Sequence, residues 1–521
     1  MLQPREYQQK IFETASKGNT LVVLPTGLGK TLIALMLAQD RLKKFPGSKI
    51  VFLAPTRPLV EQHFDYFLKN LDASDYKDKM HLFTGKIQSK KRKEIWKNAL
   101  FIFSTPQCIE NDLKNNLIDL NEVSLLIEDE CHRCLKNYSY TYVAQQYLKN
   151  IPGSSYKEKR LLGLTASPGS DSSVIKEICN NLGIENIEVR TRDNEDVKKY
   201  LQQLTNNLIY VDLSPELVAV VNILKKSYDK KAEELKNRKL LFMHATKTNL
   251  LELQKKLRIK LAGGEMDFNI LRGVSVCAQA IKIQHAIELV ETQGVEQSLR
   301  YLQDMIEQAN IGKSKAVKQI VGSREFQDSF IILKKLAQEN KEHPKFNALI
   351  AFIEQKMKEK KTIRGIIFSQ YRDTVKKIKD FLKDREIEAE VFIGQAKKNG
   401  SGLNQKEQKG IIDCFKQGKI NFLVSTSIGE EGLDIPEVDL VVFYEPIPSA
   451  IRKIQRTGRT ARLKAGEVAI FITKKTRDEQ YFWASHHKEK KMHEILNKIN
   501  VDFQKEKKDS IKGKGLGYFI N

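Results

Sequence analysis

The sequence predicts an α/β protein in which two domains, each built on a parallel β-sheet, flank an inserted all-α domain. Five short apolar runs alternate with helical patterns in the first part of the chain, at 19–27, 49–56, 99–106, 123–130 and 160–167. A second set of five lies at 364–370, 388–394, 420–427, 438–446 and 466–473. Runs that are apolar on both faces fit parallel strands covered by helices on both sides. Between the two sets, residues 216–343 contain no proline and carry apolar residues at helical spacing.

These patterns divide the chain into four parts. We expect the first sheet domain over 1–200, the helical insertion over 205–342 and the second sheet domain over 343–490. The lysine-rich end, 491–521, loses periodicity in its last part and is predicted to be a basic, flexible tail. Since the chemistry of parallel sheets gathers at the carboxyl ends of the strands, candidate residues are expected there.

The chain is strongly basic. Its 521 residues include 88 lysines and arginines against 65 aspartates and glutamates, a formal net charge of +23. Such a surplus attracts polyanions, which favours a nucleic acid partner over simple solubility. Lysines gather in the first third of the insertion, and Lys225 and Lys226 among them are candidates for contacting a nucleic-acid backbone. A solvated face is an equally good interpretation of these lysines.

Cysteine usage and hydropathy indicate the compartment. The six cysteines are scattered, which argues against a disulfide framework and for a reducing environment. The N-terminus has no signal-peptide pattern, and the longest apolar runs are too short to span a bilayer. We expect no membrane partner and a soluble intracellular protein, cytoplasmic and associated with the nucleoid in an archaeal-type cell, or nuclear in a eukaryote.

The segment "LPTGLGKT" follows the first predicted strand and opens a helix, which is the context of a phosphate-binding loop. Glycines let backbone N–H groups turn around an anion, and the helix N-terminus adds partial positive charge. In this arrangement Lys30 reaches the β- and γ-phosphates, and Thr31 can ligate Mg²⁺. Leu24 stands where the general pattern has glycine. The predicted ATP-binding residues are Leu24, Pro25, Thr26, Gly27, Leu28, Gly29, Lys30 and Thr31.

The segment "LLIEDECHRC" ends the fourth predicted strand. A phosphate-binding loop needs a carboxylate at a neighbouring strand end to hold the metal, which Asp129 can supply. Glu130 can orient and deprotonate the attacking water, and His132 can sense the γ-phosphate side. The alternative, a zinc site on Cys131 and Cys134, lacks a second pair of ligands in the sequence.

The segment "QRTGRTAR" starts a helix in the second sheet domain. Arg459 and Arg462 lie three residues apart, so they share one helical face. Guanidinium groups delivered from a facing domain stabilise charge on a transferring phosphoryl group. A pair of ordinary surface arginines is the alternative for this segment taken alone.

Taken in order, these segments resemble the signature of superfamily 2 helicases, whose motor domains are RecA-like. "REYQ" (5–8), "APTRPLVEQ" (54–62), "TG" (84–85), "STPQ" (104–107), "TAS" (165–167), "IIFSQYRDT" (366–374) and "STSIGEEGLDIP" (425–436) match its further motifs. The segments from 394 to 492, such as "TRDEQYFWASHHKEKKM", are similar to the Hef/FANCM family of motors for forked and branched DNA. "HPKFNAL" (343–349) is shared with that family and with RIG-I-like and Dicer helicases.

The resemblance implies roles for further residues. Arg5 and Gln8 would read adenine, and Gln455, Gly432 and Asp434 would line the second-domain side of the ATP cleft. Thr165 and Ser167 would couple hydrolysis to movement. The backbone of the tracking strand would be contacted by Thr56, Arg57, Gly85, Thr105, Ser369 and Thr426. The implied activity is ATP- and Mg²⁺-dependent, 3′ to 5′ movement on forked or branched DNA in repair, recognising structure rather than sequence.

Two departures from the family pattern bear on this expectation. The Hef-type sequences commonly read DEAH where this chain has DECH, which is favoured by the RIG-I and Dicer branch. An ATPase stimulated by double-stranded RNA is therefore the alternative function. The Glu-Arg-Lys-x-x-x-Asp core of the nuclease that many archaeal Hef proteins carry does not occur in this sequence.

Overall fold

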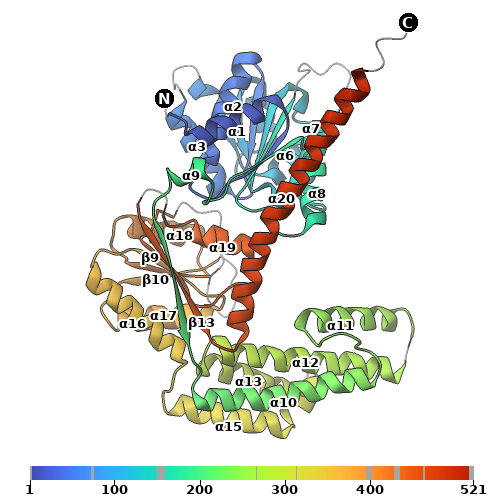
Figure 1. The fold of residues 1–521 in the computed structure, drawn as a ribbon, viewed down its shortest axis with the longest axis vertical. Helices are drawn as coiled ribbons and strands as arrows, with labels where there is room; N and C mark the ends of the chain where they lie inside the picture. The colour runs from blue at the N-terminus through green and yellow to red at the C-terminus, as the bar shows by residue number, and fades with distance from the viewer. Residues whose placement is uncertain are drawn as a thin grey trace.

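The computed structural model describes residues 3–71, 76–149, 159–265, 267–312, 314–394, 402–426, 435–461 and 464–515, with side chains to Asp502 in the last range. Two fully parallel sheets and a bundle of helices form three domains, as predicted. Figure 1 shows the helical domain beyond the second sheet domain, at the end of the molecule opposite the first. None of the helices in these ranges combines the length and apolarity that crossing a membrane requires.

The first sheet has seven strands in the order β3-β4-β2-β5-β6-β1-β7. The central strands are buried on both faces, which is why their sequences are continuous apolar runs. The strands are β1 (Thr20–Val23), β2 (Lys49–Leu53), β3 (Met80–Phe83), β4 (Phe101–Ser104), β5 (Val123–Asp129), β6 (Arg160–Thr165) and β7 (Asn186–Val189).

Helices cover both faces of this sheet and separate its core into two clusters of buried apolar side chains. They are α1 (Glu6–Lys17), α2 (Lys30–Lys44), α3 (Arg57–Asn70), α5 (Ser89–Asn98), α6 (Pro106–Lys114), α7 (Ser139–Leu148), α8 (Ser172–Asn181) and α9 (Glu195–Lys198). Short 3₁₀ turns occur at η1 (Lys77–Lys79), η2 (Leu120–Glu122) and η3 (Cys131–Arg133).

The second sheet has six strands in the order β10-β11-β9-β12-β13-β8. They are β8 (Leu204–Val211), β9 (Gly365–Phe368), β10 (Ala389–Phe392), β11 (Phe422–Ser425), β12 (Leu440–Phe443) and β13 (Gly466–Thr473). Its helices are α16 (Pro344–Glu359), α17 (Arg372–Lys383), α18 (Gln405–Lys416) and α19 (Ala450–Thr457).

Strand β8 corrects the predicted start of the helical insertion at residue 205. It pairs with β13 along its whole length, from Leu204 with Gly466 to Val211 with Thr473. Because β8 is an edge strand and half of its side chains are exposed, it shows no continuous apolar run in the sequence. The edge strands β3 and β7 were also absent from the predicted set; each has only four residues and contains a polar one, His81 in β3 and Glu188 in β7.

The inserted domain is entirely helical from α10 onward. Its helices are α10 (Pro215–Asn237), α11 (Lys247–Ala262), α12 (Phe268–Thr292), α13 (Val295–Asn310), α14 (Lys315–Val321) and α15 (Arg324–Gln338). Two apolar clusters hold it together, one between α10, α12, α13 and α15 and a smaller one under α11. Figure 1 shows α11 lying over α12 at the end of the domain.

The predicted flexible tail at 491–521 is largely a helix. α20 spans Arg477–Gly515, and it runs from the second domain along the first (Figure 1). Met492, Leu496 and Ile499 are buried in a core cluster of the first domain. These apolar residues recur at helical spacing and form the face of α20 that packs on the first domain. The prediction of a flexible tail was wrong because it relied on the high lysine content of the segment. Residues 516–521 lie outside the described ranges.

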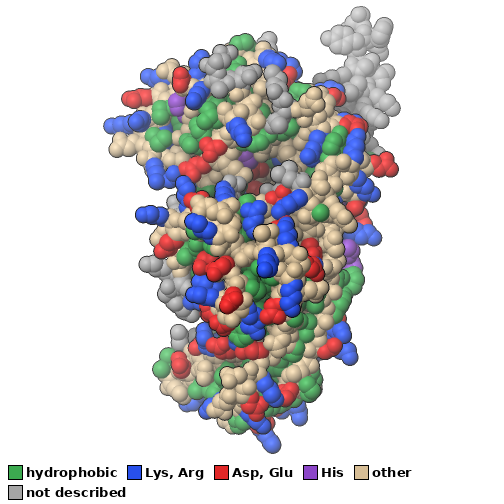
Figure 2. Space-filling view, turned by 90° about the vertical axis from the view of Figure 1, so that its left-hand side faces the viewer, with side chains coloured by type: hydrophobic (Ala, Val, Ile, Leu, Met, Phe, Trp, Pro, Cys, Tyr) green, Lys and Arg blue, Asp and Glu red, His purple; other side chains and the backbone are tan. Residues whose placement is uncertain are grey.

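Positive and negative side chains are mixed on the face of the molecule seen in Figure 2. On the face in Figure 2, blue and red side chains are interspersed over all three domains. The charge of +23 is therefore not concentrated into one patch on that face.

Candidate functional site

The loop between β1 and α2 has the geometry of a phosphate cradle. Gly27 and Gly29 have φ of +85° and +80°, which glycine adopts without strain. The ammonium of Lys30 donates to the carbonyl of Leu24 at 2.9 Å and so crosses the loop. Backbone N–H groups at the start of α2, the lysine and the helix N-terminus together present positive charge to one small space, which suits a polyphosphate.

Helix α1 packs its polar side chains onto this loop. The hydroxyl of Tyr7 and the side-chain amide of Gln8 both donate to the carbonyl of Leu28, at 2.8 and 3.1 Å. The Gln8 carbonyl oxygen accepts from the backbone N–H of Arg5 at 2.8 Å. A Cβ on Gly29 would lie 2.3 Å from the Gln8 amide, so glycine is required for this contact. The predicted pair Arg5 and Gln8 therefore lies at the loop, joined by Tyr7, which sequence reasoning missed.

A histidine links the two predicted metal ligands. His63 of α3 lies 2.9 Å from an Asp129 oxygen through Nε2 and 3.4 Å from the Thr31 hydroxyl through Nδ1. Burial acts to raise the pKa of Asp129, but the hydrogen bond and charge of His63 and the charge of Lys30 outweigh it, so the pKa is lowered. Asp129 is thus held as a carboxylate although only 5% of it is exposed. The sequence signal for His63 was its place directly after the "APTRPLVEQ" motif.

Glu130 and His132 turn toward the end of β6. Glu130 has φ of +53°, and its carboxylate lies 3.3 Å from Nδ1 of His132. The same nitrogen lies 3.1 Å from the hydroxyl of Thr165. Thr165 in turn accepts from the backbone N–H of Ser167 at 3.1 Å, and the Ser167 hydroxyl lies 2.9 Å from Sδ of Met492 in α20. The predicted residues His132, Thr165 and Ser167 thus form one chain of contacts that ends on α20.

Helix α19 brings the second sheet domain against the phosphate cradle. A Cβ placed on Gly458, just after α19, would lie 1.9 Å from the hydroxyl oxygen of Thr26. Gln455 and Arg459 are almost fully buried on either side of Gly458. Between them the guanidinium of Arg456 packs over the rings of Phe368 and Phe443, at 4.6 and 5.9 Å. Arg462, Gly432 and Asp434 lie outside the described residues.

The two cysteines of the segment lie in the apolar core of the first domain. Cys131 and Cys134 have no exposed surface, and burial raises the pKa of each thiol. Zinc binds thiolates, which this environment disfavours. Beside them Glu128 is fully buried, and this burial raises the pKa of its carboxyl well above the usual value. Among the described residues, no group of three or more His, Cys, Asp or Glu is arranged to hold a metal ion.

The residues predicted to contact a nucleic-acid strand all follow carboxyl ends of strands. Thr56, Gly85 and Thr105 come after β2, β3 and β4, which are neighbours at one side of the first sheet. Ser369 and Thr426 come after the neighbouring strands β9 and β11 of the second sheet. The space around Gly85 is open, since a Cβ there would meet no atom within 4 Å. Arg57, by contrast, is paired with Glu61 at 2.6 Å.

A buried glutamate holds Ser369, which is itself fully buried. The Ser369 hydroxyl donates to Glu445 at 3.2 Å, and the backbone N–H of Gln370 donates to the same carboxylate. Burial raises the pKa of Glu445 to about 7, against the opposing charge of Lys345. Glu445 was not predicted, and its position in "VDLVVFYEP" directly after a strand was the available signal.

The insertion lysines are less available than predicted. Lys225 is paired with Glu291 at 3.1 Å, and Lys230 with Glu325 at 2.5 Å. Lys226 is exposed, and its positive charge contributes to lowering the pKa of Glu325. These contacts give Lys225 and Lys230 a structural role within the domain, whether or not they meet a ligand.

Three family descriptions match successive parts of the chain. "DEAD/DEAH box helicase" matches residues 5–174, "Putative ATP-dependent RNA helicase, helical bundle" matches residues 216–343, and "Helicase conserved C-terminal domain" matches residues 344–464. The three matches follow the three domains of the fold.

Relatives extend over nearly the whole chain. A protein of Methanocaldococcus jannaschii named "Putative ATP-dependent RNA helicase" is 40% identical over 502 residues, 96% of this chain and 61% of that protein. The Fanconi anemia group M protein homolog of Mus musculus is 33% identical over 92% of this chain and 25% of its own length. This chain thus spans about a quarter to three fifths of these curated relatives.

A solved structure matches the fold over nearly the whole length of both chains. The crystal structure of the Pyrococcus furiosus Hef helicase domain is 41% identical, with a TM-score of 0.71, and the match covers 92% of this chain and 98% of that one.

Proposed function

Because this chain belongs to the Hef/FANCM-type branch of the superfamily 2 helicases, we propose that it is an ATP-dependent motor that moves along and unwinds forked and branched DNA. ATP would bind between the two sheet domains, and closure of that cleft would complete the hydrolytic site. The alternation between closed and open clefts is what would move the strand. We propose the 3′ to 5′ direction from the family resemblance.

The observation that carries the proposal is the approach of α19 to the phosphate cradle. Gly458 meets Thr26 so closely that only glycine fits, which brings Arg459 and Gln455 of one domain to the loop of the other. In this role Lys30 binds the β- and γ-phosphates, and Arg459 and Arg462 stabilise negative charge on the transferred group. Gly432 and Asp434 would line the same side of the cleft.

The residues present fit Mg²⁺. Thr31 offers a hydroxyl and Asp129 an ionised carboxylate on either side of the His63 ring, and oxygen donors are those that Mg²⁺ takes. Bound with ATP, Mg²⁺ would neutralise charge on the β- and γ-phosphates. Asp129 and Thr31 would hold it, with His63 orienting the carboxylate.

Glu130 is the proposed base for the attacking water. Its carboxylate is nearly buried and lies 3.3 Å from Nδ1 of His132. We propose that Glu130 orients the water and accepts its proton. His132 and Thr165 would report the state of this carboxylate through Ser167 to α20.

The tracking strand would cross the carboxyl ends of β2, β3, β4, β9 and β11, away from the ATP loop after β1. Backbone contacts of this kind do not read bases, so recognition would depend on DNA structure. The helical domain, with Lys225 and Lys226, would hold a second duplex arm. The motor would act in repair on chromosomal DNA, in the cytoplasm of a cell without a nucleus or in a nucleus.

The test is ATP hydrolysis and strand separation across matched substrates: a fork, a four-way junction, a linear duplex and a single strand. We expect the fork or junction to stimulate hydrolysis most. Lys30→Ala should abolish hydrolysis and leave DNA binding intact, because the lysine contacts phosphate and not the strand. Equal rates on all four substrates would overturn structure-specific recognition, and a hydrolytically active Lys30→Ala variant would overturn the site assignment.

The contribution of the insertion lysines to fork binding is tested by removing their charge. Lys225→Gln with Lys226→Gln should weaken fork binding and reduce the dependence of that binding on salt, since fewer counterions are released. Lys383→Gln with Lys406→Gln, on the second domain, is the matched control. Unchanged fork affinity in the Lys225 and Lys226 variant would leave these lysines as a solvated, internally paired face.

Double-stranded RNA is the second candidate substrate. It is favoured by the DECH sequence at 129–132 and by the name of the relative from Methanocaldococcus jannaschii, which describes an RNA helicase. Fork and junction substrates made in RNA separate the two functions. Stronger stimulation by RNA duplex than by DNA fork would assign the motor to RNA.

A further inference from the structure

Exposed apolar side chains are concentrated at one end of the helical domain. Six of the thirteen exposed large hydrophobic residues in the described chain lie within residues 242–271. Phe242 and Met243 precede α11, and Phe268 and Leu271 begin α12; Phe242 and Phe268 are 86% and 75% exposed. Because soluble proteins rarely leave such side chains clustered at the surface, a cluster of this kind marks an interaction site.

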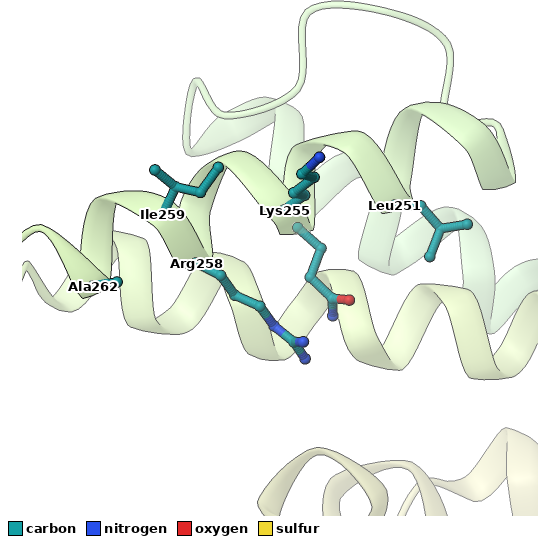
Figure 3. Close-up of a pocket in the computed structure, with 6 residues that line it drawn as sticks. Leu251, Lys255, Arg258, Ile259 and Ala262 are labelled. Carbon is teal, nitrogen blue, oxygen red and sulfur yellow. The ribbon is translucent and has the colours of Figure 1, made fainter. Parts of the chain in front are cut away.

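The remaining two, Leu251 and Ile259, lie on α11. They are 48% and 62% exposed, whereas Leu250 and Leu257 on the opposite face are buried against α12. Figure 3 shows the outward face, where a shallow cavity of about 280 Å³ follows the helix. Its lining residues recur at intervals of three, four and seven, so they form one stripe about 17 Å long. They are Leu251, Gln254, Lys255, Arg258, Ile259 and Ala262.

The charges of α11 are uncompensated on this face. The helix has five basic residues and one acidic residue, Glu252. Lys247 and Lys260, near its two ends, are paired with Glu288 at 3.0 Å and Glu265 at 3.2 Å. Within the described part of the chain, Lys255, Lys256 and Arg258 form no ion pair, in contrast to Lys225 and Lys230 on α10. The stripe is therefore apolar at its ends and cationic in its middle.

We propose that this face of α11 is a docking surface for an amphipathic helix of a partner protein that carries an apolar stripe flanked by aspartate or glutamate. Leu251 and Ile259, two turns apart, would take apolar side chains of that helix. Lys255 and Arg258 would pair with its acidic residues, which fixes its direction and register. This surface goes beyond the proposed motor activity and does not depend on it.

The chemistry of the face favours a protein over a nucleic acid. Phosphate backbones are bound by cations with little need for apolar contact, whereas Leu251 and Ile259 offer exposed aliphatic surface. Pairing with a second copy of α11 would bring the like charges of Lys255, Lys256 and Arg258 together, which disfavours that occupant. An acidic amphipathic helix satisfies both the apolar and the cationic parts of the stripe.

The experiment is selection of displayed random peptides of about 16 residues, the length of α11, on the full chain. Peptides are counter-selected on a Leu251→Glu, Ile259→Glu variant, whose substitutions lie on exposed positions. We expect enrichment of sequences with leucine-type residues at helical spacing and with aspartate or glutamate beside them. Enrichment of basic or non-amphipathic peptides, or of the same peptides on both proteins, would overturn the proposal.

Charge reversal tests the cationic part of the surface with one selected peptide. Lys255→Glu with Arg258→Glu should weaken its binding at least about tenfold, and Lys225→Glu, on α10, should leave it unchanged. Fluorescence anisotropy measures both. Thermal unfolding and DNA-stimulated ATP hydrolysis should be unaffected by the α11 substitutions. Loss of DNA stimulation with unchanged peptide binding would identify a phosphate-binding face, and a dimer that dissociates on Ile259→Glu would identify a second copy; either result would refute the proposed partner.

Discussion

His63 is the residue on which the predicted metal ligands depend. It reaches both Thr31 and Asp129, and its ring packs on Phe52 with centroids 4.4 Å apart. The ring is thus fixed by packing, and the hydrogen bond it makes fixes the carboxylate. Partners of this kind behind a metal ligand commonly contribute 10–100-fold in metal affinity.

His63→Ala should raise the Mg²⁺ concentration for half-maximal ATP hydrolysis by about tenfold, because Asp129 loses the partner that orients it. Titrating Mg²⁺ at saturating ATP measures this. His63→Gln keeps a hydrogen-bond donor, so its Mg²⁺ concentration for half-maximal hydrolysis should lie between those of His63→Ala and the unchanged protein. The same Mg²⁺ requirement in all three proteins would show that His63 only packs.

Glu445 makes folding stability depend on pH. Its pKa is raised to about 7 by burial, opposed by the charges of Lys345 and Arg456 and reinforced by Asp478. The folded value lies above the unfolded value, so the contribution to stability is complete below about pH 4.5 and is lost as pH rises through 7. Glu445→Gln should remove this part of the decline in unfolding free energy between pH 5 and 8. Denaturant unfolding at several pH values measures it, with the exposed Glu388→Gln as control; an unchanged slope in Glu445→Gln would contradict the assignment.

At the scale of elements, the end of α19 sets how closely the two sheet domains meet. Gly458→Ala would place a methyl group 1.9 Å from the Thr26 hydroxyl, so the helix end must withdraw from the phosphate cradle. ATP hydrolysis should fall by about tenfold or more, because Arg459 moves with the end of α19. DNA binding without nucleotide should change little.

The control for Gly458→Ala is Gly410→Ala in α18, where an added Cβ meets nothing within 4 Å and alanine favours the helix. Steady-state ATPase assays on both variants separate a steric effect from a general glycine effect. Full activity in Gly458→Ala would mean that closure does not require this contact.

The edge strands show how element prediction failed. β3, β7 and β8 lie at sheet edges, and no continuous apolar run marks them: half of the β8 side chains are exposed, and the four-residue strands β3 and β7 contain the polar residues His81 and Glu188. Each pairs through backbone hydrogen bonds that any side chain permits. Their existence was therefore decided by the neighbouring strands and not by their own residues.

At the scale of the whole molecule, α20 touches all three domains. Near its start, Arg477 lies 3.5 Å from Glu288 of the helical domain, and Asp478 pairs with the buried Lys345 at 2.5 Å. Glu489 pairs with Lys453 of α19 at 3.0 Å, and Met492 meets Ser167 of the first domain. Through these four contacts α20 links the second domain to both the helical domain and the first domain.

Met492→Ala with Leu496→Ala should detach α20 from the first domain. We expect each domain to remain folded and basal ATP hydrolysis to persist, while stimulation by DNA falls severalfold because the domains no longer move together. ATPase assays with and without fork DNA measure this, and thermal unfolding reports domain integrity. The exposed Val501→Ala is the matched control. Full DNA stimulation after detachment would show that α20 only covers the core.

The sequence by itself determined the two-sheet architecture, the helical insertion and the local site motifs, because continuous apolar runs and the phosphate-binding segment are properties of contiguous residues. The tertiary structure decided what depends on contacts between distant segments. It brought His63 between Thr31 and Asp129, placed β8 in the second sheet, seated Met492 and Leu496 of a lysine-rich helix in the first domain, and paired Lys225 with Glu291. Such partners lie tens to hundreds of residues apart, and only packing selects them.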